Sequence, residues 1–490
     1  MVRAVASALR RTPADWGVGE VTRTLIRGGR VVTAVDDYVA DVLIEDGRIE
    51  AIGRSLPADD AEVHDASGLL VMPGGIDAHV HMETPMGDLR TVDSFETGTV
   101  SAAFGGTTTI IDFAQQFHGE SPRMALERRL AAAEPQCCVD YGFHVILTDA
   151  NRDALAELPS IVNDEGVSSF KLYMAYPGVL MVDDAAIYRT MRAVGDHGGM
   201  VNLHAENGVV IQALIDEALE AGNTSPKFHA LTRPSIMEGE ATHRVIRIAE
   251  LADIPVYIVH LSAKEALEAV VEARDRGIHA FAETCPHYLF LDESEYERPG
   301  FEAAKFVMTP PLRNHDCQHA LWRGLQFDDL QLVATDHCPF CFNEERFGVL
   351  MSKAAGTEDF SKIPNGAPGV EYRLPLLFDG GVGAGKINLN RFVQLVSTAP
   401  AKMFGLFPRK GTIAVGSDAD VVLFDPEAEH VLSAETHHSL VDYSMFEGRR
   451  VKGQVKKVFL RGECIVDGEQ WLGRAGMGRF QKRGASGRIL

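Results

Sequence analysis

The chain has 490 residues, 47 Lys and Arg against 69 Asp and Glu, a formal net charge of −22, and 46% hydrophobic residues. This length exceeds the roughly 250–300 residues at which a single core stops growing, so at least two domains are expected. The acidic excess argues against a nucleic-acid or anionic-membrane partner, and no apolar run approaches the ~20 residues that cross a bilayer. Seven cysteines are too few for a disulfide scaffold, which indicates a reducing cytoplasm.

The two ends of the chain have the pattern of short β-strands. Apolar β-branched runs are broken by the turn pairs Gly28-Gly29 and Asp46-Gly47 over residues 21–72, and the same pattern returns over residues 411–472. Each half is too short to bury a sheet by itself, so we expect one small β-sandwich domain assembled from both ends. Residues 1–20 are expected to form an N-terminal extension, and the Gly- and Arg-rich residues 473–490 a C-terminal tail.

The segment between these ends, residues 73–410, alternates strand-like and helix-like stretches. Eight apolar runs, the first in LLVMPGGIDAHVH and the last in LQLVATDH, are separated mostly by amphipathic stretches such as SAKEALEAVVEARDRG. This alternation predicts an α/β fold, either a (β/α)8 TIM-like barrel or a doubly wound open sheet. In a barrel of parallel strands, every C-terminal strand end opens on one face, where active sites are built.

Polar residues end five of these predicted strands. His79 and His81 stand at positions i and i+2, so both imidazoles can face one point, and Lys171 is a costly cation within an apolar run. Each such residue alone is more often structural, as a core histidine, a snorkelling lysine or a capping aspartate. Their coincidence favours the barrel, with a metal site at its mouth, and the candidate ligands are His79, His81, Lys171, His204, His260 and Asp336.

Lys171 bears on the number of ions that this set could hold. Four histidines and one carboxylate could bind two divalent ions, but they need a bridging ligand. A lysine that has reacted with CO₂ is an anionic carbamate with two oxygens, which would supply the bridge and remove a buried cation. Asp77 and Glu206 are candidates for orienting the neighbouring histidines through hydrogen bonds.

From about residue 22 to residue 473, the sequence resembles the dihydropyrimidinase/hydantoinase branch of the cyclic amidohydrolases. The resemblance rests on the motifs GGIDAHVH, FKLYMAYPG, NLHAENG, ETCPHYL, ATDHCPF and IPNGAPGVE. It implies a barrel with a small β-sandwich, and two divalent ions, expected to be Zn²⁺, bridged by Lys171 after carboxylation by CO₂. One ion would be bound by His79, His81, Lys171 and Asp336, and the other by Lys171, His204 and His260.

The resemblance also implies an activity, the hydrolysis of 5,6-dihydropyrimidines and 5-monosubstituted hydantoins to N-carbamoyl amino acids. Asp336 would act as general base and then acid, Tyr176 would polarise the ring carbonyl, and Thr309 and Asn365 would contact the ring. A cytoplasmic homotetramer acting on a small cyclic diamide is implied as well. The alternatives are an allantoinase, a dihydroorotase-like amidase, or a metal-free scaffolding relative, which the intact ligand set disfavours.

The loop after His81 bears on the choice of substrate. Dihydroorotase-like relatives place an arginine two residues beyond the second histidine, where its guanidinium can bind a substrate carboxylate. This chain has Glu83 at that position, and Met82 and Met86 make the loop apolar, so neutral ring substituents are expected. Arg90 lies close by in sequence and could restore the carboxylate contact.

Overall fold

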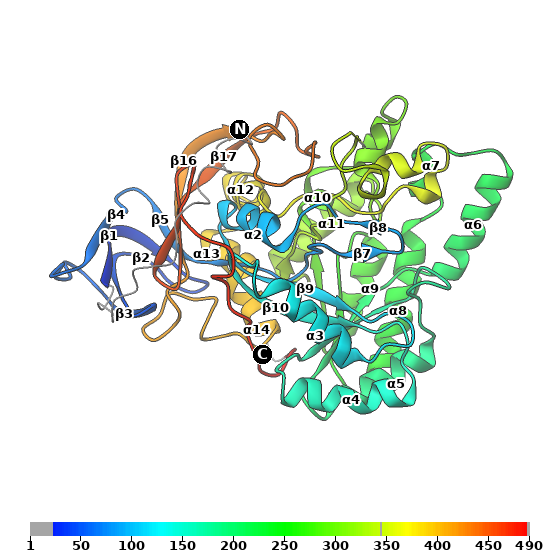
Figure 1. The fold of residues 1–490 in the computed structure, drawn as a ribbon, viewed down its shortest axis with the longest axis horizontal. Helices are drawn as coiled ribbons and strands as arrows, with labels where there is room; N and C mark the ends of the chain where they lie inside the picture. The colour runs from blue at the N-terminus through cyan, green and yellow to red at the C-terminus, as the bar shows by residue number, and fades with distance from the viewer. Residues whose placement is uncertain (1–22, 344, 488–490) are drawn as a thin grey trace.

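The computed structural model describes residues 23–343 and 345–487, so the predicted N-terminal extension over residues 1–20 lies outside the described part. Figure 1 shows a sheet built from both ends of the chain on the left and a barrel surrounded by helices on the right. Among the helices that the structure describes, none is long and apolar enough to cross a membrane.

Eight parallel strands form the barrel, and their order around it follows their order along the chain, β6-β9-β10-β11-β12-β13-β14-β15. The strands are short and almost completely buried, because helices cover their outer faces. Their bounds are Gly75–Asp77 (β6), Thr107–Gln115 (β9), Asp140–Ile146 (β10), Ser169–Tyr173 (β11), Met200–His204 (β12), Val256–Ile258 (β13), Ala280–Thr284 (β14) and Leu332–Val333 (β15).

The outer helices pack on the strands through apolar faces. In α9, the buried residues Ala266, Val270 and Ala273 recur at helical spacing. Several helices begin at a side chain that accepts a hydrogen bond from the first turn, as Asp183 does for α5. The main outer helices are Pro122–Ala133 (α3), Arg152–Asn163 (α4), Asp184–Gly195 (α5), Ser235–Ala252 (α8), Lys264–Asp275 (α9) and His315–Phe327 (α11).

Side chains link the first and last barrel strands, β6 and β15. The buried guanidinium of Arg373 donates to the carbonyl oxygens of Ile76, at 2.7 Å, and Val333, at 3.0 Å. The carboxylate of Asp77 accepts hydrogen bonds from the amide and the hydroxyl of Thr335, at 3.1 and 2.6 Å. These bonds hold together the strand ends that carry His79 and Asp336.

The nine strands of the second sheet come from both ends of the chain. Its order is β19-β18-β17-β16-β5-β1-β2-β3, with β4 paired to β1. One apolar cluster mixes the two ends, with Ile26 and Val42 from the N-terminal part and Leu423 and Phe459 from the C-terminal part. The strands are Arg23–Val32 (β1), Asp37–Glu45 (β2), Arg48–Gly53 (β3), Glu62–Asp65 (β4), Leu70–Pro73 (β5), Val421–Val431 (β16), Arg450–Leu460 (β17), Glu463–Asp467 (β18) and Gln470–Trp471 (β19).

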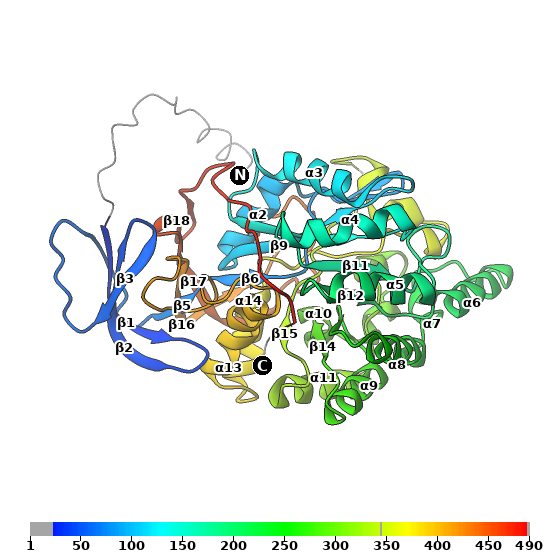
Figure 2. The same ribbon diagram turned by 90° about the horizontal axis from the view of Figure 1, so that it is seen from below.

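The segment from residue 473 to residue 487, which the sequence suggested as a tail, lies against the barrel (Figure 2). The amide of Gln481 donates to the carbonyl of Tyr141, and the amide of Gly487 donates to the carbonyl of Met403. The buried guanidinium of Arg483 donates to the hydroxyl of Ser169 at 2.9 Å. This segment therefore packs against the strand ends opposite the predicted site.

Candidate metal centre

Five of the six predicted ligand residues converge at the mouth of the barrel. The Nε2 atoms of His79 and His81 lie 3.3 and 3.2 Å from Oδ1 of Asp336. Nδ1 of His204 lies 3.0 Å from Nε2 of His260. Ligand atoms of His79, His260 and Asp336 all lie within 4.8 Å of one another. The two predicted ligand groups are therefore parts of one cluster.

Lys171, the sixth residue, lies fully buried on β11 beside this cluster. Its Nζ has no hydrogen-bond partner among the described residues and lies 5.4 and 5.0 Å from the ring centroids of Phe113 and Tyr173. Burial lowers the pKa of Lys171 to about 7, although the charges of Asp336 and Glu283 act to raise it. An unpaired amine that loses its proton near neutral pH is the nucleophilic form that reacts with CO₂.

The imidazoles fit a metal as well. Burial lowers the pKa of His81, His204 and His260, which favours the neutral imidazole that binds metal ions. The buried Nδ1 atoms of His81 and His260 have no hydrogen-bond partner within residues 23–343 and 345–487. The nitrogens that face the cluster are the opposite ones, Nε2 of His81 toward Asp336 and Nε2 of His260 toward Nδ1 of His204. Neutral imidazoles with one carboxylate and an unpaired lysine are a donor set suited to divalent ions.

Carboxylates behind the cluster orient two of the histidines. Oε1 of Glu283 lies 2.5 Å from Nδ1 of His79, and Oε2 of Glu206 lies 2.8 Å from Nε2 of His204. Each carboxylate accepts the proton of one ring nitrogen and so leaves the other nitrogen free to bind a metal. The sequence indicated Glu206 for this role but missed Glu283. Asp77, the other candidate, contacts the backbone amide of His79 rather than its ring, at 3.3 Å.

Three residues of the site have strained backbone conformations. Tyr176, His260 and Asp336 have φ values of +64°, +38° and +49°, in the left-handed region that side chains other than glycine rarely occupy. Such a conformation costs about 1–3 kcal/mol per residue and persists only where surrounding contacts enforce it. Three such residues in one cluster indicate that the fold positions these side chains at a cost in stability.

Asp336 is held in its ionised form. Burial acts to raise the pKa of this carboxyl, but the nearby His79, His81 and Lys171 outweigh burial and leave the pKa below its ordinary value. The carboxylate is therefore available as a metal ligand and as a proton acceptor near neutral pH.

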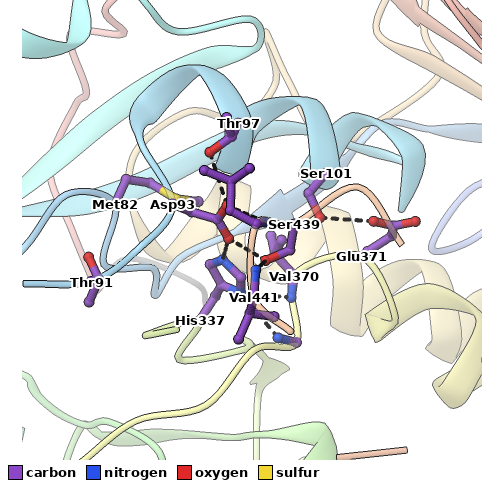
Figure 3. A network of polar contacts seen from close by, with 12 residues as sticks. Met82, Thr91, Asp93, Thr97, Ser101, His337, Val370, Glu371, Ser439 and Val441 are labelled. Atoms are coloured by element: carbon purple, nitrogen blue, oxygen red, sulfur yellow. Dashed lines mark hydrogen bonds and ion pairs between the residues drawn. The ribbon is translucent and has the colours of Figure 1, made fainter. Parts of the chain in front are cut away.

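A network of hydrogen bonds fixes the residue after Asp336 (Figure 3). Nε2 of His337 lies 3.0 Å from Oδ2 of Asp93, and its Nδ1 accepts the amide of Gly369 at 3.1 Å. The hydroxyl of Ser439 also donates to Oδ2 of Asp93, at 2.5 Å. The network ties the strand end that carries Asp336 to the loop of Asp93, earlier in the chain, and to the segments of Gly369 and Ser439, later in the chain. The sequence did not predict this network.

The three predicted substrate residues also lie together. The side-chain nitrogen Nδ2 of Asn365 lies 3.4 Å from the hydroxyl of Tyr176. Tyr176 and Thr309 both line a cavity of about 40 Å³, together with Glu206 and Arg233. Burial raises the pKa of Tyr176 to about 12, so the phenol keeps its proton and can donate a hydrogen bond at neutral pH.

The loop after His81 differs from its expected arrangement in two respects. Met82 is completely buried and packs beneath the loop, so it is not available to contact a substrate. Glu83 forms an ion pair with Arg90, with 2.9 Å between Oε1 and Nη2. Glu83, which stands where dihydroorotase-like relatives have an arginine, is thus paired with Arg90, the residue that could have bound a substrate carboxylate. Met86 remains partly exposed.

A parallel barrel with histidines, a buried lysine and an aspartate at one mouth defines a metal-dependent hydrolase of the amidohydrolase class. A sequence model described as the Amidohydrolase family matches residues 70–465, and the chain belongs to this family. Of its relatives, the D-hydantoinase of Streptomyces coelicolor is 51% identical over 467 residues, covering 94% of this chain and 98% of the relative. The dihydropyrimidinase of Rattus norvegicus is 41% identical over 468 residues, covering 94% and 89%.

Solved structures agree with these relatives. The crystal structure of dihydropyrimidinase from Brevibacillus agri superimposes with a TM-score of 0.93 at 49% sequence identity, covering 95% of this chain and 99% of that one. Similarity at this level extends over the sheet from the chain ends as well as the barrel. The predicted fold, a TIM-like barrel with a second domain made from both chain ends, is therefore confirmed.

Proposed function

We propose that this protein is a binuclear metal hydrolase that opens the cyclic amide of 5,6-dihydropyrimidines and 5-monosubstituted hydantoins to give N-carbamoyl amino acids. The observation that carries the proposal is the convergence of four histidines and Asp336 beside a buried, unpaired Lys171. The printed names of the relatives, D-hydantoinase and dihydropyrimidinase, supply the substrate class.

Two divalent ions, which we expect to be Zn²⁺, fit this donor set. Lys171, carboxylated by CO₂, would bridge the two ions, with the remaining ligands divided as the sequence predicts. When bound, such ions supply a Lewis acid for the ring carbonyl and lower the pKa of a water molecule toward neutrality. The ligand residues are His79, His81, Lys171 and Asp336 for one ion, and Lys171, His204 and His260 for the other.

Residues of the protein transfer the proton, stabilise the developing negative charge and hold the ring. Asp336 accepts a proton from the attacking water and returns it to the ring nitrogen that leaves, acting as general base and then general acid. Tyr176 donates its phenolic proton in a hydrogen bond to the carbonyl oxygen as negative charge develops there. Main-chain groups at Thr309 and Asn365 hold the ring beside Tyr176, which fits the contact between Asn365 and Tyr176.

The remaining assignments follow the resemblance. We propose a homotetramer in the cytoplasm, with residues 21–72 and 411–472 as the β-sandwich domain and residues 73–410 as the catalytic barrel. Residues 1–20 would be an N-terminal extension, and residues 473–490 a C-terminal tail that lies along the barrel over its described part.

Steady-state kinetics on a panel of rings test the proposed substrate class. We expect efficient hydrolysis of 5,6-dihydrouracil, dihydrothymine and 5-monosubstituted hydantoins, because partly exposed Met86 offers an apolar wall and Arg90 is paired with Glu83. Dihydroorotate should react poorly, and allantoin, which is neutral but polar, should fall between. A kcat/KM for dihydroorotate equal to or above that for dihydrouracil would overturn the assignment.

A further inference from the structure

Three lysines are buried in the described part of the chain, and two of them have an evident role. Lys171 belongs to the metal centre, and Lys410 forms ion pairs with buried carboxylates. Lys353 is also completely buried, yet it lies outside the metal centre and is absent from the proposed mechanism. Burying a cation is costly unless polar groups compensate it, so its surroundings indicate what it does.

The ammonium of Lys353 donates to three main-chain carbonyl oxygens. These belong to Val307 at 2.7 Å, Pro364 at 2.6 Å and Gly366 at 2.6 Å. Burial acts to lower the pKa of Lys353 to about 7. The three carbonyl oxygens favour the charged form, because an ammonium has three N–H donors and the three short hydrogen bonds match them one to one. The three carbonyls come from two segments that are far apart along the chain and lie side by side here.

Both segments carry a proposed substrate residue. Thr309 is two residues beyond Val307, and Asn365 is flanked on both sides by residues whose carbonyls are bound to Lys353. The amide of Gly366 donates to the carbonyl of Val307 at 3.1 Å, so the segments also contact each other directly. Lys353 therefore lies at the junction between the two segments.

Geometry fixes how this junction acts on Asn365. In a trans peptide, the carbonyl and the amide N–H point in opposite directions, so binding the carbonyl of Pro364 sets the direction of the Asn365 N–H. Gly366 has a φ of +147°, and a Cβ there would lie 2.3 Å from the carbonyl oxygen of Cys338, so only glycine fits at the turn after Asn365.

We propose that Lys353 is a positioning residue whose ammonium joins the Thr309 segment to the Asn365 segment and sets the spacing of the substrate-binding groups beside Tyr176. This inference rests on the proposed function, because Thr309 and Asn365 are assigned to the substrate there. Lys353 acts through main-chain carbonyls and has no contact with the metal ligands in its hydrogen bonds.

The test compares Lys353→Met, which keeps the length of the side chain without its donors, with Lys362→Met as the matched control. Lys362 lies close in sequence, and its side chain is 70% exposed in an ion pair with Asp359. KM and kcat for dihydrouracil, metal content and melting temperature are measured for each. We expect Lys353→Met to lose about 10²-fold in kcat/KM, mainly through a higher KM, as misplacement of substrate-binding groups by about 1 Å would cause.

Metal content should remain that of the wild type, and Lys353→Gln, which retains two N–H donors, should fall between Met and Lys. A KM unchanged in Lys353→Met overturns the inference. Loss of metal, or failure of both variants to fold, also overturns it, because Lys353 would then support the barrel as a whole. A wild-type protein that opens no ring refutes the proposed function instead, whereas an active wild type with an equally active Lys353→Met refutes only this inference.

Discussion

The tautomer of each histidine decides which of its nitrogens can bind an ion. Nδ1 of His79 faces Glu283, whose other carboxylate oxygen accepts the hydroxyl of Tyr257 at 2.7 Å. Glu283 is completely buried and also lies 3.2 Å from the amide of His260. One carboxylate thus orients a ligand from each of the two predicted ion sites, which makes it the most consequential residue that the sequence did not reveal.

Replacing Glu283 by glutamine tests this role. The carboxamide keeps the shape of the side chain, and its oxygen can still accept from Nδ1 of His79 and from the amide of His260, but it removes the negative charge that strengthens these hydrogen bonds and raises the basicity of the imidazole. We expect a 10–100-fold loss of metal affinity, the range typical of residues that orient metal ligands, measured by competition with a chelator.

The control is Glu272→Gln on the surface of α9, whose side chain is 63% exposed. It should bind metal as the wild type does. Wild-type metal affinity in Glu283→Gln would show that the charge of Glu283 does not strengthen metal binding by His79.

At the scale of the strands and loops, the features that depend on neighbouring residues in the chain could be predicted from the sequence. The alternation of apolar runs gave the strands, and the spacing of His79 and His81 placed two ligands on one face. Residues whose role depends on distant partners escaped prediction. Glu283 and His79 are 204 positions apart, and Arg373 and Ile76 are 297 apart. No periodicity within a strand or helix encodes such contacts.

The loop after His81 illustrates the same limit. From the sequence, Met82 was expected to contribute to an apolar wall of the pocket, and Arg90 was a residue that could restore a contact with a substrate carboxylate. The structure buries Met82 against α2 (Phe95–Phe104), close to Gly98, and pairs Arg90 with Glu83. Which face of an irregular loop is exposed depends on the elements packed beneath it, and residue types alone do not determine this.

At the scale of the whole molecule, a buried ion cluster joins the barrel to the sheet of the chain ends. Nζ of Lys410 lies 2.8 Å from Oδ2 of Asp140, the first residue of β10, and 2.5 Å from Oδ2 of Asp420, just before β16. Arg461, at the end of β17, also pairs with Asp140. Because these residues come from the barrel and from the sheet of the chain ends, the cluster couples the stability of the barrel to that of the sheet.

This cluster predicts a pH dependence of stability. Burial acts to raise the pKa of Asp140, but Lys410 and Arg461 outweigh burial and lower the pKa below 3.8. A carboxyl with a lowered pKa contributes stability that is present above its unfolded pKa and is lost as the pH falls through its folded pKa. The melting temperature of the wild type should therefore fall as the pH drops below 3.8.

Lys410→Met should add a pH dependence of the opposite sign near neutral pH. Removing the cation leaves Asp140 and Asp420 buried without it, which costs about 3–5 kcal/mol. It raises the pKa of Asp140, and it raises further the pKa of Asp420, which burial already holds above its ordinary value. Their protonation should then stabilise the variant as the pH falls from about 8 to 5. Melting temperatures across this range, with exposed Lys264→Met as the control, would contradict the account if both variants followed the wild-type curve.

The most direct test of the central claim is the metal content per chain of the purified protein, measured by mass spectrometry alongside Lys171→Arg. The account predicts close to two divalent ions per chain in the wild type, because the cluster has more donors than the four that one tetrahedral ion takes. Lys171→Arg should lose metal and ring-opening activity together, since a guanidinium stays cationic and cannot become an anionic bridge. A wild-type protein without metal that still opens dihydrouracil, or an active Lys171→Arg enzyme with its full metal content, would contradict the account.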